Sequence, residues 1–217
     1  MKKAAVILSG CGVFDGAEIH EAVLTLLSLE KHGASYQCFA PDMEQLHVVN
    51  HLTGEVVEGE SRNVLTEAAR IVRGNIKPVS ECNVDDFDLL VLPGGFGAAK
   101  NLCTFAIDGP DCAFNSEVLT VCKGFAKAGK PAAYACIAPA LAAKVYGNDT
   151  NLTIGNDAGT ATALETFGAK HQNCAVDSVI IDQEAKLVTT PAYMLGQNIL
   201  EVSIGLDKMV QSVLALK

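Results

Sequence analysis

The sequence predicts a single α/β domain built on a doubly wound, mostly parallel β-sheet with helices on both faces. Short β-rich runs alternate with helical patterns along the chain, which is typical of parallel strands joined by crossover helices. The chain has 217 residues, 49% of them hydrophobic, and this size and composition fit one compact domain with a large core. No internal repeat, low-complexity segment or linker divides residues 1–217, so we expect one domain.

The first third of the chain predicts two strands and two helices. The strands are expected at residues 4–9 and 36–40, and the helices at 18–32 and 63–73. Ala22, Leu26, Leu27 and Leu29 are expected on the apolar side of the first helix, and glycines stand where both helices end, at Gly33 and Gly74.

Between these elements, residues 41–60 form a stretch that is too long for a simple connection. Val48-Val49 and Val56-Val57 suggest a small hairpin within it. Because loops of this length in compact domains are often functional, we expect the stretch to cap a site or to mediate assembly.

The rest of the chain continues the alternation of strands and helices. Gly129 ends one expected helix, and Pro139 stands in the first turn of another. The expected strands are residues 89–92, 131–135 and 152–154 with a hairpin of 179–181 and 187–189, and the expected helices are 98–105, 116–128, 138–146, 159–167 and 196–216.

Charge and composition exclude several functions. A net charge of -9, with 16 scattered basic residues, opposes a nucleic-acid-binding or anionic-membrane surface, so a small uncharged ligand is the simpler expectation. The apolar runs are too short to span a bilayer, and no signal-peptide core is present at the start, so we expect a soluble, cytoplasmic protein. The 8 cysteines are expected to be reduced. No metal site is predicted, because the chain has no Cys-x-x-Cys motif and the pair His47 and His51 lacks a third ligand nearby.

Cys136 is the first candidate catalytic residue. It stands where the apolar strand at 131–135 meets the helix at 138–146, and this junction is where α/β enzymes place a nucleophile. The positive end of the helix dipole would favour the thiolate there. The alternative is a small buried core residue, which is the usual state of an unreactive cysteine.

Two other features are expected at the same edge of the sheet. The run from Leu90 to Gly97 ends a strand in a glycine-rich turn, where Gly94 and Gly95 leave backbone N–H groups to hold an oxyanion, although turn chemistry alone also explains glycines there. Asp15, Glu18 and Glu21 form an acidic cluster after the first strand, which helix capping also explains. Because ligands bind beyond the carboxyl ends of the strands, a thiol, oxyanion donors and a carboxyl group are expected to converge in one pocket.

These residues stand in sequence blocks that resemble a known family, the ElbB glyoxalase-like proteins with their mitochondrial ES-type relatives. This family lies within the superfamily of the Parkinson-associated deglycase and the PfpI proteases, which has a class I glutamine amidotransferase-like domain. The resemblance spans nearly the whole chain. The blocks that carry it are residues 8–21, Phe39-Ala40-Pro41-Asp42, residues 60–65, residues 93–101, Cys136-Ile137-Ala138-Pro139 and Thr189-Thr190-Pro191-Ala192-Tyr193.

The resemblance implies a flavodoxin-like fold and assigns roles to the candidate residues. Cys136 would be the nucleophile and Glu21 its protonated carboxylic partner, with Glu18 as the competing carboxylate. Gly95 and Ile137 would supply backbone N–H donors beside Gly94. We also expect Asn101 to form hydrogen bonds near the glycine turn and to contribute to substrate binding.

The function implied is that of a glutathione-independent glyoxalase-like lyase or hydratase. It would convert a small aldehyde substrate, glyoxal, to glycolate through a Cys136 hemithioacetal, without cofactor, metal or nucleotide. No histidine follows Cys136 directly or about twenty residues later, so protease and amidotransferase activity are disfavoured and slow turnover is expected. The superfamily also implies a homodimer.

The sequence also allows other interpretations of these residues. Cys136 could be a redox-sensing or partner-binding thiol, and Cys11 could pair with it or simply pack in the interior. His20 is expected to lie at the surface or in an interface, and Tyr193 and Met194 are expected to pack. A historical name in the family suggests an accessory role in isoprenoid metabolism, which no residue supports.

Overall fold

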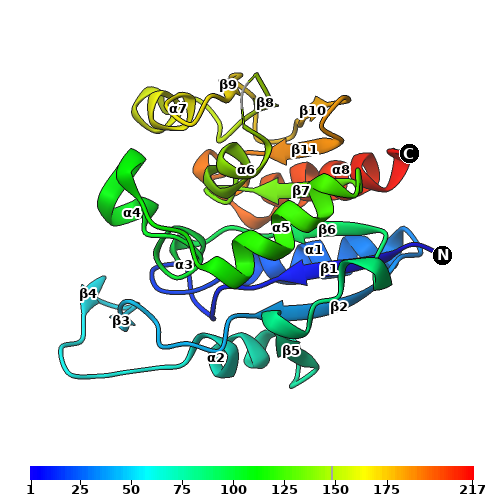
Figure 1. The fold of residues 1–217 in the computed structure, drawn as a ribbon. Helices are drawn as coiled ribbons and strands as arrows, with labels where there is room; N and C mark the ends of the chain where they lie inside the picture. Colours follow the sequence, from blue (N-terminus) through cyan, green and yellow to red (C-terminus); the bar gives the residue numbers. More distant parts are fainter. Residues whose placement is uncertain (148) are drawn as a thin grey trace.

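The computed structural model describes residues 1–147 and 149–217, and its centre is a seven-stranded sheet (Figure 1). The strand order is β10-β11-β7-β6-β1-β2-β5, and every neighbouring pair is parallel except β10 with β11. The strands of this sheet are β1 (Lys3–Ile7), β2 (Ser35–Ala40), β5 (Ile76–Pro78), β6 (Leu89–Leu92), β7 (Ala132–Ala135), β10 (Ile180–Asp182) and β11 (Leu187–Thr190). The doubly wound, flavodoxin-like α/β fold that the sequence predicts is therefore confirmed.

Helices cover both faces of the sheet, as Figure 1 shows. Strand β1 illustrates why: Ala5 and Ile7 pack into one apolar cluster with the side chains of α5 and α6, whereas Ala4 and Val6 pack into a second with those of α1, α2 and α8. The helices that build these two layers are α1 (Ile19–Lys31), α2 (Val64–Ile71), α5 (Ser116–Lys127), α6 (Pro139–Tyr146) and α8 (Ile199–Ala215).

Side-chain caps fix where several of these helices begin. Asn63 accepts a hydrogen bond from Thr66 N, Asn115 from Val118 N and Asn198 from Glu201 N. These acceptors satisfy N–H groups that a helix leaves unpaired in its first turn. The observed starts lie within a few residues of the predicted ones for this reason.

The sequence prediction differs from the structure in three places. The expected helix at 98–105 is two short helices, α3 (Phe96–Lys100) and α4 (Phe105–Asp108), because Cys103 between them forms a β-bridge with Phe114. Strand β5 was not predicted; it is a short edge strand that ends in Pro78. The expected strand at 152–154 is β8 (Asn151–Leu152), which pairs with β9 (Lys170–His171) in a separate small sheet.

The stretch at 41–60 contains the predicted hairpin, formed by β3 (Val49–Asn50) and β4 (Glu55–Val56). It projects from the body of the molecule beyond the carboxyl ends of the parallel strands (Figure 1). Asp15 Oδ2 accepts a hydrogen bond from Val49 N at 2.7 Å, and His51 Nε2 accepts one from Phe14 N at 3.2 Å. The hairpin is therefore fastened to the turn that follows β1.

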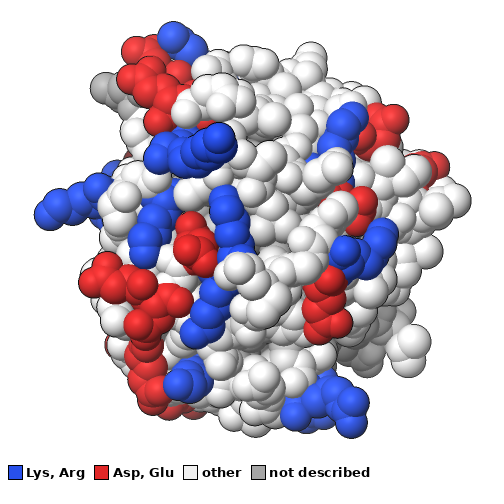
Figure 2. Space-filling view, turned by 90° about the vertical axis from the view of Figure 1, so that its right-hand side faces the viewer, with Lys and Arg blue, Asp and Glu red and all other residues white. Residues whose placement is uncertain are grey.

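The remaining helix, α7 (Ala158–Glu165), lies near α4 at the same end of the molecule. The opposite end, where both chain termini lie, carries interspersed acidic and basic side chains (Figure 2). That face presents no continuous basic surface of the kind that binds nucleic acid. Within the described residues, no helix combines the length and hydropathy that crossing a bilayer requires.

Candidate active site

Cys136 occupies a sharp turn between β7 and α6. Its φ of +61° lies in the left-handed region, which costs a non-glycine residue about 1–3 kcal/mol and persists only where surrounding structure enforces it. Two features hold this backbone conformation of Cys136. Its N–H donates to Thr190 O at 3.0 Å, and helix α6 begins soon after it, with Pro139 in the first turn. The side chain is 7% exposed and lies at the carboxyl edge of the sheet.

The backbone N–H groups of Gly95 and Ile137 lie close enough to the Cys136 sulfur to lower the pKa of the thiol. Gly95 reaches this position with a φ of +96°, and a Cβ atom on it would overlap Glu18 N and Gly16 O. Only glycine fits there. The two donors predicted from the sequence thus converge on the thiol.

Glu21 lies beneath the thiol, in the first turn of α1, and is fully buried. Its Oε2 accepts a hydrogen bond from Gly94 N at 2.9 Å and its Oε1 accepts one from Tyr193 N at 3.1 Å. Burial raises the pKa of the Glu21 carboxyl to about 7; the Tyr193 N–H opposes this shift and the charge of Glu18 adds to it. Glu21 can therefore gain and lose a proton near neutral pH.

Gly94 separates the thiol from the carboxyl group. A Cβ atom on Gly94 would overlap Cys136 Cβ and would lie 2.7 Å from Glu21 Oε2 and 2.9 Å from Cys136 Sγ. The absence of a side chain at Gly94 is what lets the Glu21 carboxyl group approach the Cys136 thiol.

The pKa of the Cys136 thiol is raised well above its ordinary value, first by burial and then by the charge of Glu21. The N–H groups of Gly95 and Ile137 lower this pKa but do not outweigh the burial. The sequence predicted a lowered pKa from the helix dipole, and that prediction is wrong because a buried thiolate loses its hydration. Near neutral pH the thiol therefore stays protonated while Glu21 titrates, and the ionised form of Glu21 is placed to take the thiol proton.

A cavity of about 440 Å³ opens above Cys136. Its walls come from the turn after β1, the start of α1, helices α3, α4 and α7, and the segment η4 (Ala192–Met194). The lining residues are Val13, Glu18, Gly95, Phe96, Ala99, Phe105, Ala106, Cys136, Ile137, Thr160, Tyr193 and Met194. The thiol therefore faces a pocket large enough for a small organic ligand.

Known proteins similar to this chain were found among curated sequences and solved structures, although no protein-family model matches it. The human mitochondrial glutamine amidotransferase-like class 1 domain-containing protein 3 is 48% identical, over 99% of this chain and 83% of the relative. The mitochondrial ES1 protein homolog of Rattus norvegicus is 47% identical, over 99% of this chain and 84% of the relative. The chain belongs to the family of these ES1 proteins.

The ES1 family has a solved bacterial member. The crystal structure of an isoprenoid biosynthesis protein with an amidotransferase-like domain from Ehrlichia chaffeensis matches with a TM-score of 0.90 and 35% identity, over 98% of both chains. Glyoxalase III from Candida albicans matches with a TM-score of 0.62 at 13% identity, which shows a shared fold alone. The resemblance to the ES-type proteins stated from the sequence is confirmed.

The relatives also correct one prediction. The mitochondrial ES1 relatives contradict the cytoplasmic location that was predicted from the sequence. That prediction used the lack of an apolar signal-peptide core, but mitochondrial transit peptides are amphipathic and rich in arginine, so the criterion does not address mitochondrial import.

Asn101 has a different place in this ES1-family protein from the one predicted. Its side chain is 3% exposed, donates to Ser9 O and Asp15 O at 2.9 Å each, and accepts from Leu46 N at 2.9 Å. Asn101 does not line the cavity above Cys136. We revise its predicted role from substrate binding to holding three loops together.

Glu18 is both a cap and part of the pocket wall. Its Oε2 accepts a hydrogen bond from Glu21 N at 2.7 Å, so it caps α1, and its side chain also lines the cavity. The competing carboxylate therefore lines the same pocket, but Glu21 is the one whose charge raises the pKa of the Cys136 thiol.

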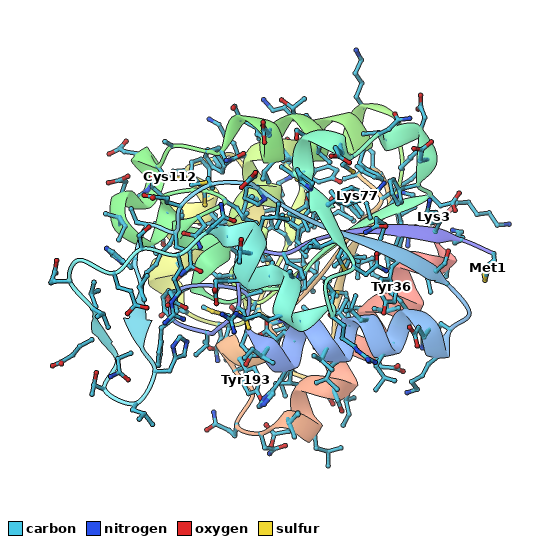
Figure 3. All side chains as sticks on the ribbon, turned by 90° about the horizontal axis from the view of Figure 1, so that it is seen from below. Met1, Lys3, Tyr36, Lys77, Cys112 and Tyr193 are labelled. Carbon is cyan, nitrogen blue, oxygen red and sulfur yellow. The ribbon has the colours of Figure 1, made fainter. Side chains whose placement is uncertain are left out.

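Tyr193 has two roles that the sequence did not indicate. Its N–H binds Glu21, and its ring lines the cavity beside the first turn of α1, where Figure 3 shows it. The Tyr193 hydroxyl is 2.8 Å from His20 Nδ1, so His20 touches the pocket wall as well as the surface. In the sequence, the one indication of a role for Tyr193 was that a family block ends there. The contact with Glu21 uses the backbone N–H, which every residue except proline has, so the residue type could not predict it.

Cys11 and the hairpin lie outside the pocket. The pKa of the Cys11 thiol is raised first by burial and then by the charges of Glu67 and Asp15, whereas the charge of Arg70 lowers it. Cys11 and Cys136 are both free thiols, so they form no disulfide with each other. No residue of 41–60 lines the cavity, so the hairpin does not cap it within the described chain.

Proposed function

We propose that this protein is a cofactor-independent glyoxalase-like enzyme that converts 2-oxoaldehydes to 2-hydroxy acids, with glyoxal giving glycolate. One observation carries the proposal: the Cys136 thiol stands in a pocket with two N–H donors above the sheet edge and with a buried carboxyl group of near-neutral pKa beside it. A substrate that supplies its own electrophile needs no further group.

The first step forms the covalent adduct. The Cys136 sulfur attacks the aldehyde carbon while the Glu21 carboxylate takes the thiol proton, and the carbonyl π electrons move to oxygen. The Gly95 and Ile137 N–H groups are directed at the sulfur and so lie close to the new oxyanion. Return of the proton from Glu21 to this oxygen gives a neutral hemithioacetal.

The second step moves hydrogen between the two substrate carbons. Glu21 removes the proton from the hemithioacetal carbon, the electron pair is held as an enediolate, and the proton returns to the neighbouring carbon. The hydroxyl proton of the former aldehyde carbon passes to the oxygen on the neighbouring carbon, so the first carbon becomes the thioester carbonyl. The product is a thioester of Cys136 with a 2-hydroxy acid. Water cleaves the C–S bond and restores the thiol, so the balance is one oxoaldehyde and one water consumed for one hydroxy acid formed.

The other functions fit this site less well. A redox sensor needs an accessible thiolate, whereas Cys136 is 7% exposed and its pKa is raised. An amidotransferase needs a histidine base, and none is among the described cavity-lining residues. The Ehrlichia relative is named for isoprenoid biosynthesis. An isoprenoid diphosphate would call for cationic groups, and the described lining has no Lys or Arg.

The test is glycolate formation from glyoxal in Tris-free buffer without glutathione, quantified by chromatography. Cys136→Ser and Glu21→Gln should both abolish most of the product, whereas Cys174→Ser, which changes a half-buried thiol outside the pocket, should retain it. If wild-type protein makes no more glycolate than Cys136→Ser, glyoxal is not a substrate.

The homodimer implied by the resemblance stays a prediction. Light scattering on the purified protein should give twice the chain mass, since the chain itself has a mass of 22.7 kDa. A single-chain mass at micromolar concentration would contradict it.

A further inference from the structure

The cavity above Cys136 is much larger than glyoxal needs. It holds about 440 Å³, which is within the range of pockets that bury drug-sized ligands, whereas glyoxal has only four non-hydrogen atoms. A ligand that small would leave most of the walls in contact with water and would gain little from them. The excess volume indicates a substrate with a sizeable substituent.

The walls of the cavity are mainly apolar. Among the described lining residues, Glu18, Thr160 and Tyr193 are the ones besides Cys136 that bring polar side chains to it. The apolar side chains come from several separate segments of the chain: Val13, Phe96, Ala99, Phe105, Ala106, Ile137 and Met194. An apolar substituent on the substrate would replace water at these surfaces, at a gain of about 25 cal/mol per Å².

The charges around the cavity disfavour an anionic substituent. No Lys or Arg is among the described lining residues, and Glu18 contributes a carboxyl group. Lys100 lies on the same helix as Phe96, but its ammonium group donates to Phe14 O at 2.9 Å and lies 5.3 Å from the Phe96 ring centroid. A carboxylate or phosphate in the pocket would lose hydration without gaining a cation.

Two of the three polar side chains, Glu18 and Tyr193, lie where the α1 and η4 segments meet, whereas Thr160 comes from α7. Glu18 Oε1 is 4.0 Å from His20 Nδ1, which is 2.8 Å from the Tyr193 hydroxyl. Phe105 and Ala106, by contrast, come from α4. The pocket thus offers polar partners for a dicarbonyl group near Cys136 and apolar contacts for the rest of the ligand.

We infer that the preferred substrates are uncharged 2-oxoaldehydes with an apolar substituent of about the size of a phenyl ring. The inference rests on the proposed function and narrows its substrate class. The reaction is the same: a substituted oxoaldehyde adds Cys136 at its aldehyde carbon, one hydrogen moves to the adjacent carbon, and water releases the substituted 2-hydroxy acid.

The experiment compares glyoxal, methylglyoxal and phenylglyoxal, with glycolate, lactate and mandelate measured by chromatography and Cys136→Ser as the blank. The expected result is a kcat/KM for phenylglyoxal at least about 10-fold above that for glyoxal, because each well-packed methylene is worth about 10-fold or more. A phenylglyoxal with a para carboxylate should fall below the neutral compound by at least 10-fold. Equal or higher kcat/KM for glyoxal overturns the inference and leaves the proposed function standing, whereas no product from any of the compounds overturns both.

A variant with a larger side chain in the pocket wall separates the contribution of pocket binding from the intrinsic reactivity of the aldehydes. Ala106→Phe places a ring on an exposed wall position of α4 and should lower the phenylglyoxal-to-glyoxal ratio of kcat/KM by at least 10-fold. Ile107→Phe is the matched control, because Ile107 is the next residue, is 56% exposed and does not line the cavity. An unchanged ratio in Ala106→Phe, or an equal fall in both variants, would contradict the inference.

Discussion

The turn that follows β1 and the turn that follows β7 lie at the same edge of the sheet, and each contains a cysteine. In the first turn Gly10 and Gly12 take the left-handed conformation, with φ of +113° and +131°, so Cys11 between them is free of that strain. In the second turn Cys136 itself is left-handed, with a φ of +61°. Cys136 faces two N–H donors and Glu21, whereas Cys11 lies among Glu67, Arg70 and Asp15.

The comparison shows what makes a strand-end cysteine a candidate nucleophile. Both thiols have raised pKa values, and burial is the main cause in each. What differs is the partner group. Glu21 is placed to take the proton of Cys136, whereas no carboxyl group among the described residues forms a hydrogen bond that shifts the pKa of Cys11. Position at the sheet edge is shared, but the base and the oxyanion donors are not.

The largest expected effect separates the two cysteines directly. Cys136→Ser should lower oxoaldehyde turnover by at least about 1,000-fold, because the hydroxyl is a far weaker nucleophile. Cys11→Ser should stay within about 2-fold of wild type. Product formation by both variants under the conditions of the glycolate assay is the measurement, and equal losses would break the distinction between the two turns.

The second prediction concerns the base. If the Glu21 carboxylate takes the thiol proton, kcat/KM should rise with pH through about 7, the raised pKa of Glu21. Glu21→Gln should lose about 100-fold at pH 8 and should not show this rise. A pH profile that Glu21→Gln leaves unchanged in shape would assign the titration to another group.

The same carboxyl group should affect stability. Because the pKa of Glu21 is about 7 in the folded state and 4.5 in its ordinary state, the folded protein binds the extra proton between these values. Its contribution is therefore full below about pH 4.5 and is lost as pH rises through about 7, by ~3 kcal/mol. Urea unfolding of wild type and Glu21→Gln at pH 5 and pH 8 should show this loss only in wild type.

The fourth prediction tests the spacing between thiol and carboxyl group. Gly94→Ala should lower turnover by about 100-fold, because the new Cβ would displace Cys136 and Glu21. Gly159→Ala is the matched control: its nearest neighbour, Asp157 Oδ1, would lie at an ordinary 3.5 Å. Circular dichroism should confirm that both variants fold, and full activity in folded Gly94→Ala would show that the close packing is not needed.

The smallest effect is expected in the turn after β1. Asp15→Ala leaves the buried Val49 N–H without its acceptor and should lower the free energy of unfolding by about 1–3 kcal/mol. Turnover should stay within about 2-fold, because Asp15 fastens the hairpin and does not line the cavity. A loss of turnover comparable to that of Gly94→Ala would mean that the hairpin shapes the site.

The sequence by itself determined the order of the main elements and the position of the nucleophile candidate. Strand β6 and the start of α5 lie where apolar runs and an N-terminal cap predict them, because these signals are local. Cys136, the Gly94-Gly95 turn and the acidic cluster at residues 15–21 also follow from strand ends, since parallel strands bring their carboxyl ends to one edge. The choice of Glu21 over Glu18 came from the family resemblance.

Only the tertiary structure decided the contacts that join distant segments. The Tyr193 N–H on Glu21 links residues 172 apart, and the Asn101 side chain serves three loops rather than a ligand. The raised pKa of the Cys136 thiol also depends on the full packing around it, because burial is the sum of contacts from many segments and outweighs the local dipole. Local patterns in a sequence specify helices, strands and turns, whereas desolvation and long-range hydrogen bonds exist only once the chain is folded.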